Sequence, residues 1–180
     1  LRVVNSTFYG NPAPSSGVGL YCTTLCLATL YNCVFLDATA AWEFYFTGGA
    51  DLSAKNCLVP GGLPGSRVSL GTGSIRLVNE GNIGGNPGFI DAPGGDFRLR
   101  MDSPCVDAGN GDEAPAADFD GSPRVDSSLI VNTGTGTPDY TDIGAFEDPG
   151  ALPAGIFGRI TGSVVEGVSV SLTGDETDST

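Results

Sequence analysis

The chain has 180 residues and a formal net charge of −13, with 21 acidic residues, 8 basic residues and no histidine. This balance excludes a surface suited to nucleic acid, and the lack of histidine excludes Ser-His-Asp and Cys-His catalysis within the chain. With 28 glycines, 12 prolines and 40% hydrophobic residues, the composition predicts an all-β protein with many turns and a modest core.

An apolar, polar, apolar phrase that ends in asparagine recurs four times in residues 1–83. The asparagines are separated by 27, 24 and 23 residues and are Asn5, Asn32, Asn56 and Asn79. The positions four and two residues before them are apolar, and the positions between these are polar. This period of two predicts a short strand with one buried face in each repeat. A further apolar position, three residues after the asparagine, fails at Asn82 in the fourth repeat.

Strands of about five residues with one apolar face need neighbours, and stacking them about 4.8 Å apart gives them a shared core. An asparagine at the same corner of each coil suits a left-handed turn, and its amide can hydrogen-bond the asparagines above and below. The alternative is four unrelated turn residues. Because each asparagine comes with the same apolar columns, we favour a structural ladder.

Repeats of this length without a helical period fit a right-handed parallel β-helix better than a leucine-rich repeat. Residues 4–11, VNSTFYGN, resemble the coils of the pectate-lyase-like superfamily. That superfamily includes polysaccharide lyases, glycosidases, phage tailspikes and adhesins, so the resemblance implies the architecture and leaves the activity open. We therefore predict parallel β-helix coils over residues 1–85. Since the first repeat starts at Leu1, we also expect further coils before it.

The cysteines leave two interpretations open. Cys33 and Cys57 each follow a ladder asparagine, so they are expected to stack in adjacent coils, and Cys22 and Cys26 are close in sequence. Either pair could form a disulfide. Alternatively, cysteine fills these places as a small apolar residue, which we favour slightly.

An aromatic cluster follows the second repeat and includes Trp42 and Tyr45. Exposed aromatic rings stack on sugars, so these two residues are candidate carbohydrate contacts. The alternation with smaller residues also fits a strand whose aromatic side chains are buried, which is the favoured interpretation.

Residues 86–147, here named the acidic segment, do not continue the asparagine repeat. Five phrases follow one another: NPGFID at 86–91, DFRL at 96–99, SPCVDAG at 103–109, DFDGSPR at 118–124 and DIGAFE at 142–147. In this order they resemble the end of β-helix proteins in the bacterial choice-of-anchor Q group, which are secreted or surface proteins. The resemblance implies location and architecture. We expect the acidic segment to cap the exposed strand edge of the last coil.

Two interpretations compete for the carboxylates of the acidic segment. Asp118 and Asp120, with Asp126 nearby, have the alternate spacing of a calcium loop, so calcium is a candidate cofactor. The competing interpretation is structural: the aspartates cap turns, and Arg124 forms an ion pair with Asp142 or Glu147. Because short Asp-x-Asp-Gly strings are common in turns, we favour the structural interpretation.

Residues 148–158 have the composition of a linker. The alternating residues 160–164 and 168–172 then resemble the opening of a carboxypeptidase-regulatory-like or B-type repeat domain. We predict that residues 159–180 are the truncated start of a β-sandwich-like module.

The sequence predicts no complete catalytic site. The acids and bases of the repeats lie in different frames, without the paired carboxylates of a glycosidase or the calcium site and base of a lyase. We expect a non-catalytic scaffold or adhesin-like segment of a secreted or cell-surface bacterial protein, whose partners are extracellular polysaccharide or cell-surface components. The alternatives are a polysaccharide lyase or glycoside hydrolase with its active site on preceding coils, and a carbohydrate-binding module. No apolar stretch reaches membrane-spanning length, so no membrane insertion is expected.

Overall fold

The computed structural model describes residues 1–12, 17, 19–36, 43–63, 68–71 and 77–150. Trp42, most of the predicted linker and the predicted module at 159–180 lie outside these residues. The predicted all-β class is confirmed, since the described part contains strands and no helix. The strands are β1 (Arg2–Val4), β2 (Thr7–Tyr9), β3 (Leu20–Thr23), β4 (Leu27–Tyr31), β5 (Val34–Leu36), β6 (Phe44–Thr47), β7 (Asp51–Lys55), β8 (Val68–Leu70), β9 (Leu77–Glu80), β10 (Phe89–Asp91) and β11 (Asp96–Leu99).

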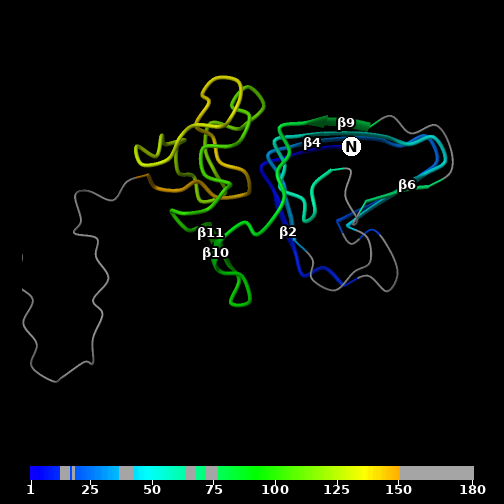
Figure 1. The fold of residues 1–180 in the computed structure, drawn as a ribbon, viewed down its shortest axis with the longest axis horizontal. Helices are drawn as coiled ribbons and strands as arrows, with labels where there is room; N and C mark the ends of the chain where they lie inside the picture. Colours follow the sequence, from blue (N-terminus) through cyan, green and yellow to red (C-terminus); the bar gives the residue numbers. More distant parts are fainter. Residues whose placement is uncertain (13–16, 18, 37–42, 64–67, 72–76, 151–180) are drawn as a thin grey trace, which may run out of the picture.

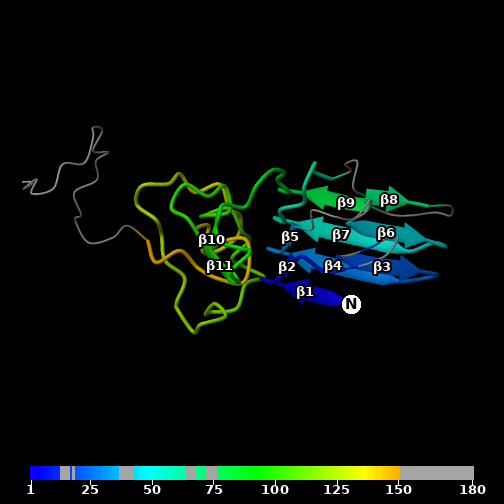
Figure 2. The same cartoon turned by 90° about the horizontal axis from the view of Figure 1, so that it is seen from below.

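Strands from successive repeats stack in parallel into three sheets (Figure 1). The largest sheet has the order β1-β4-β7-β9, the second has the order β3-β6-β8, and the third pairs β2 with β5. Figure 2 shows the first two sheets running side by side, with their strands in opposite directions. The register matches equivalent positions of the first three repeats, for example Val3 with Leu30 and Leu30 with Ala54.

The core of the repeats is built by the apolar face of each strand. In β4 and β7, alanine and leucine alternate inward while the residues between them stay half-exposed. Phenylalanines fill the middle of this core: Phe8 and Phe35 stack with ring centroids 4.6 Å apart, and Phe44 meets Phe35 edge-on at 4.5 Å. The same side chain thus recurs at the same place in consecutive repeats, as the sequence columns predicted.

A second core lies between the repeats and the acidic segment. Val34 and Phe35 are consecutive, but Phe35 belongs to the first core and Val34 to the second. Val34 and Leu58 from the repeats pack with apolar residues of the acidic segment, namely Leu99, Cys105, Val106, Ala108 and Ile143. The antiparallel pair β10–β11 opens this segment, and turns and isolated bridges dominate the remainder up to Gly150.

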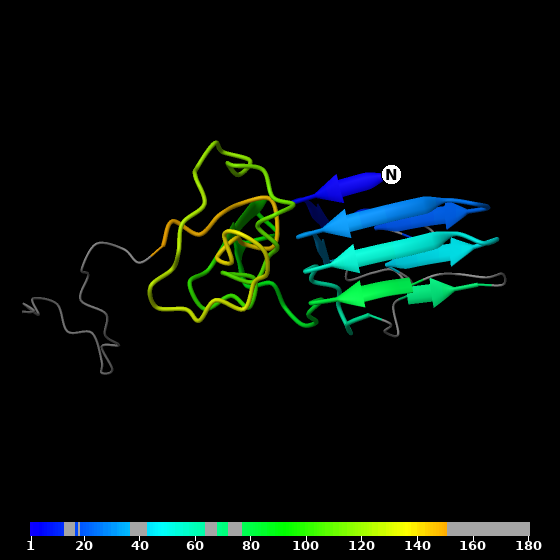
Figure 3. The same ribbon diagram turned by 90° about the horizontal axis from the view of Figure 1, so that it is seen from above.

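The acidic segment lies along the side of the stack. Figures 2 and 3 show it beside the ends of β1, β4, β7 and β9, and its hydrogen bonds reach the first three repeats. We expected this segment to cover the strand edge of the last coil; within the described residues, these hydrogen bonds follow one corner of the first three repeats. The corner that it does cover carries buried amides and carbonyls, which need partners as much as a strand edge does.

The register of β9 corrects the predicted ladder. Asn79 pairs with Ala54, so Gly81, and not Asn79, continues the column of Asn56. The position needs a positive φ, which glycine adopts at no steric cost. Gly81 has φ +63°, and a Cβ on it would lie 3.0 Å from Asn56 Nδ2. Asn79 is exposed and lies outside the column.

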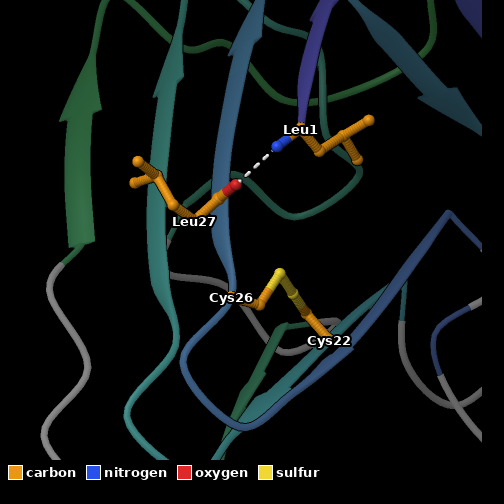
Figure 4. Close-up of a disulfide and its surroundings, with 4 residues drawn as sticks. All are labelled: Leu1, Cys22, Cys26 and Leu27. Carbon is orange, nitrogen blue, oxygen red and sulfur yellow. Dashed lines mark hydrogen bonds between the residues drawn. A yellow bond between two sulfur atoms is a disulfide. The ribbon is translucent and has the colours of Figure 1, made fainter.

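A disulfide closes the turn between β3 and β4, where Cys22 and Cys26 are bonded (Figure 4). Thr24 and Leu25 inside this turn have φ values of +57° and +53°, which are uncommon for residues other than glycine. In the same region, the amino group of Leu1 donates a 2.8 Å hydrogen bond to the carbonyl of Leu27.

Candidate functional site

The asparagine column forms the corner at which each repeat turns from one sheet into the next. Asn5, Asn32 and Asn56 have φ values of +42°, +52° and +49°. Asparagine tolerates this left-handed region better than most residues, which explains its recurrence at the corner. Asn32 and Asn56 are buried, so their amides must find partners within the protein.

The amides of the column bind the acidic segment as well as one another. Asn32 Nδ2 donates to Asn5 Oδ1 at 3.0 Å, which is the amide contact that a ladder requires. The same nitrogen donates to the carbonyl of Asn110 at 2.9 Å, and Asn56 Nδ2 donates to the carbonyl of Ala108 at 3.0 Å. Asn5 Nδ2 donates to the carbonyl of Gly144 at 3.2 Å. The column is therefore a docking strip for the backbone of the acidic segment.

The acidic segment donates in return. The N–H of Asn110 donates to Asn32 Oδ1 at 2.6 Å, and the N–H of Gly144 donates to the Asn32 carbonyl at 2.9 Å. Gly109 makes this close approach feasible, because a Cβ there would lie 2.7 Å from the Thr141 carbonyl and 3.2 Å from Asn32 Cγ. The two halves of the molecule are thus joined by reciprocal, directional bonds at one strip.

A buried carboxylate network holds the acidic segment in shape behind this strip. Asp142 Oδ1 accepts from the N–H of Asp107 at 2.8 Å, and Asp142 Oδ2 accepts from the N–H of Asp148 at 2.6 Å. Glu147 Oε1 accepts from the N–H of Val125 at 3.0 Å. Each carboxylate therefore ties together backbone segments that are distant in sequence.

Burial raises the pKa values of these carboxyl groups. The pKa of Asp142 rises to about 8, first because the group is buried and then because Glu147 lies near it. Burial also raises the pKa of Asp107 to about 6 and is the main cause of the raised pKa values of Glu147 and Asp148. The network therefore favours proton uptake in the folded state.

The structure places Arg124 against Glu147 rather than Asp142. Arg124 Nη1 lies 2.6 Å from Glu147 Oε2, and both side chains are almost fully buried, at 6% and 1% exposure. Asp142 contributes its N–H to the same Glu147 oxygen at 3.2 Å. The ion pair therefore neutralises one of the buried acids and leaves Asp142 to the backbone donors.

The carboxylate of Asp118 is occupied by backbone donors. Asp118 Oδ1 accepts from the N–H groups of Asp120 and Ser122 at 2.9 and 2.8 Å, and its Oδ2 accepts from the N–H of Glu147 at 2.9 Å. Within the described ranges, no group of three or more histidine, cysteine, aspartate or glutamate residues is arranged to hold a metal ion. The structure thus gives Asp118 a turn-capping role and does not bring Asp118, Asp120 and Asp126 together as ligands.

The outer face of the β1-β4-β7-β9 sheet carries charges in pairs. Arg2 forms an ion pair with Glu113 of the acidic segment, and its guanidinium carbon lies 5.4 Å from the centre of the Tyr31 ring. Lys55 Nζ lies 2.7 Å from Glu80 Oε2. Among the described residues, Arg2 and Lys55 on this face are therefore each engaged with an acid.

An aromatic stack lies on the outer face of the β3-β6-β8 sheet. The rings of Tyr21 and Tyr45 are 5.1 Å apart and inclined by 7°, and Tyr21 is 58% exposed. Their neighbours Phe44 and Phe46 are buried in the core. Sequence reasoning found Tyr45 but missed Tyr21. The spacing of 24 residues, which also relates Cys33 to Cys57, was the signal that could have found it.

No protein-family model, curated protein or solved structure matches this chain. Across the described residues, no helix has the length and apolar character needed to cross a membrane.

Proposed function

We propose that this chain is a non-catalytic scaffold or adhesin-like segment of a secreted or cell-surface bacterial protein, built as a right-handed parallel β-helix. The resemblance to the pectate-lyase-like superfamily and the choice-of-anchor Q group supports the architecture and the location. Its partners would be extracellular polysaccharides or other cell-surface components.

The observation that carries the proposal is the in-register stacking of equivalent strands, sealed along one corner by the acidic segment. This construction gives regular, ribbed outer faces and commits the polar groups of the corner to holding the fold. The paired charges of Arg2 with Glu113 and of Lys55 with Glu80 fit the same role.

The test is incubation with a panel of neutral, uronic and amino-sugar polysaccharides, with release of new chain ends as the readout. A scaffold leaves the length of every polymer unchanged. Product release that is lost in Asp51→Asn or Glu80→Gln would replace the scaffold with an enzyme, since both acids lie on strands of the β1-β4-β7-β9 sheet. The ion-pair variant Arg98→Gln, on β11, serves as a matched surface control.

A second candidate function is carbohydrate binding, which the exposed Tyr21–Tyr45 stack favours. Flat aromatic surfaces stack on sugar rings, and two rings in register offer a platform along the stack. The single tryptophan of the chain, Trp42, lies three residues from Tyr45 and provides a fluorescence readout. Titration with oligosaccharides should shift this signal, Tyr21→Ala should remove the shift and Tyr140→Ala should preserve it. No shift with any sugar would remove this candidate.

A further inference from the structure

Two free thiols occupy equivalent positions in consecutive repeats. Cys33 and Cys57 directly follow Asn32 and Asn56, and both cysteines are fully buried in the first core. Neither takes part in the Cys22–Cys26 disulfide. The scaffold proposed above has no use for their chemistry, because an apolar residue would fill the same space.

The backbone around the two thiols is aligned as in a parallel sheet. The N–H of Leu58 donates to the Cys33 carbonyl at 2.9 Å, and Val34 and Leu58 form a parallel bridge. Neighbouring strands are about 4.8 Å apart, which falls within the Cα separation of about 4.4 to 6.8 Å that a disulfide spans. The backbone therefore needs no large movement to accept a bond between the two residues.

The sulfur of Cys57 lies against Cys33, while Cys33 Sγ donates to the carbonyl of Tyr31 at 3.1 Å. The N–H of Cys33 donates to Cys57 Sγ at 3.4 Å. A side-chain hydrogen bond from Cys57 is the main cause that lowers the pKa of Cys33, whereas burial raises the pKa of Cys57. The two thiols thus form a contacting pair between repeats.

We propose that Cys33 and Cys57 are a disulfide-forming pair, joined when the chain meets a disulfide oxidant of the glutathione class, and that the bond ties two consecutive repeats together. The Cys33 thiolate attacks oxidised glutathione and expels one glutathione thiolate. The Cys57 thiolate then attacks the Cys33 sulfur and expels the second. Two protein thiols are oxidised, one glutathione disulfide is reduced to two thiols, and the cysteine protons pass to the glutathione thiolates.

The reaction belongs to the folding chain, before the core closes around the sulfurs. Cys105 is the built-in comparison, because it is equally buried but lies in the second core, apart from this column. No described residue of the asparagine column brings Cys105 into register with Cys33 or Cys57, so it should stay a free thiol.

The experiment is refolding of the reduced, unfolded chain in a glutathione redox buffer, followed by peptide mapping and thiol counting under denaturing conditions. We expect a crosslinked peptide pair containing Cys33 and Cys57, and a fall from the three free thiols of the present structure to one. Cys105→Ala should retain the crosslink, and Cys57→Ser should lack it. A map that shows Cys33 and Cys57 unlinked, or linked to other cysteines, overturns the proposal.

A stability measurement separates the inter-repeat bond from the Cys22–Cys26 bond. Adding a reductant should lower the Tm of the refolded wild type by more than it lowers the Tm of Cys57→Ser, in which only Cys22–Cys26 is reduced. Equal decreases would contradict a stabilising bond between the repeats. The peptide map of the wild type decides the question even if Cys57→Ser folds poorly.

Discussion

Asn32 is the residue on which the two halves of the molecule converge. It donates to Asn5 and Asn110, and it accepts from Asn110, all within a buried corner. An unpaired buried polar group costs about 1 to 3 kcal/mol. Asn32 therefore contributes more than its own hydrogen bonds, because its removal leaves several partners without water or a substitute.

Asn32→Ala should lower the free energy of unfolding by roughly 2 to 4 kcal/mol, since it orphans several buried groups. Asn79→Ala is the matched control, because Asn79 is exposed and lies outside the column, so a change within about 0.5 kcal/mol is expected. Denaturant unfolding of both variants checks this. An equal loss of unfolding free energy in Asn32→Ala and Asn79→Ala would mean that Asn79 is part of the ladder.

Asp118 is a second single residue whose side chain holds several backbone groups in place. Because its oxygens accept three backbone N–H groups, Asp118→Ala should lower the Tm, whereas exchanging calcium for a chelator should leave the wild-type Tm unchanged. Asp126→Ala controls for the loss of one negative charge. A calcium-dependent rise in Tm that disappears in Asp118→Ala would reinstate the metal.

At the scale of the element, the turn between β3 and β4 is more strained than its counterpart one repeat later. Thr23 pairs with Thr47, so Leu25, with φ +53°, corresponds to Gly49, with φ +80°. Leu25 is 83% exposed and buries little apolar surface. Its side chain therefore adds steric cost without adding much packing.

Leu25→Gly should raise the stability by about 0.5 to 1 kcal/mol, because relief of the left-handed strain outweighs the entropy that glycine adds to the unfolded chain. In the counterpart turn, Gly48→Ala should destabilise, since Gly48 corresponds to Thr24 and a Cβ on it would meet the Thr24 nitrogen at 2.9 Å. Thermal unfolding measures both changes. A lower Tm for Leu25→Gly would mean that the strain is absent.

The strands of the repeats were predictable because each carries its own apolar column, as in Leu30 and Ala54. The fourth repeat was misaligned because asparagine served as the marker, whereas the physical requirement is a positive φ, which Gly81 also meets. The docking of the acidic segment was not predictable. It depends on backbone carbonyls such as those of Ala108 and Gly144, which leave no trace in the side-chain pattern.

At the scale of the whole molecule, the buried carboxyl groups link stability to pH. The pKa of Asp142 rises from 3.8 to about 8 and that of Asp107 from 3.8 to about 6. The folded state therefore binds protons more tightly than the unfolded state between these values. Stability from these two groups is fully present below about pH 3.8 and declines as the pH rises, up to about 6 for Asp107 and about 8 for Asp142.

The Tm should accordingly be higher near about pH 5 than near about pH 9. Asp142→Asn removes one titrating group, so the fall in Tm on the alkaline side should become shallower. The exposed aspartate Asp102 provides the control, as Asp102→Asn should leave the slope unchanged. A wild-type Tm that rises from about pH 5 to about pH 9 would contradict this prediction, because it would mean that folding does not raise the pKa values of these carboxyl groups.

The lateral position of the acidic segment also governs how the molecule comes apart. In an array whose units touch only their neighbours, terminal units fray first and the rest persist. Here the acidic segment is hydrogen-bonded to the first repeat at Asn5, to the second at Asn32 and to the third at Asn56. Separating the first repeat from the stack would require breaking its bonds to the acidic segment, so the first three repeats and the acidic segment should unfold as one cooperative unit.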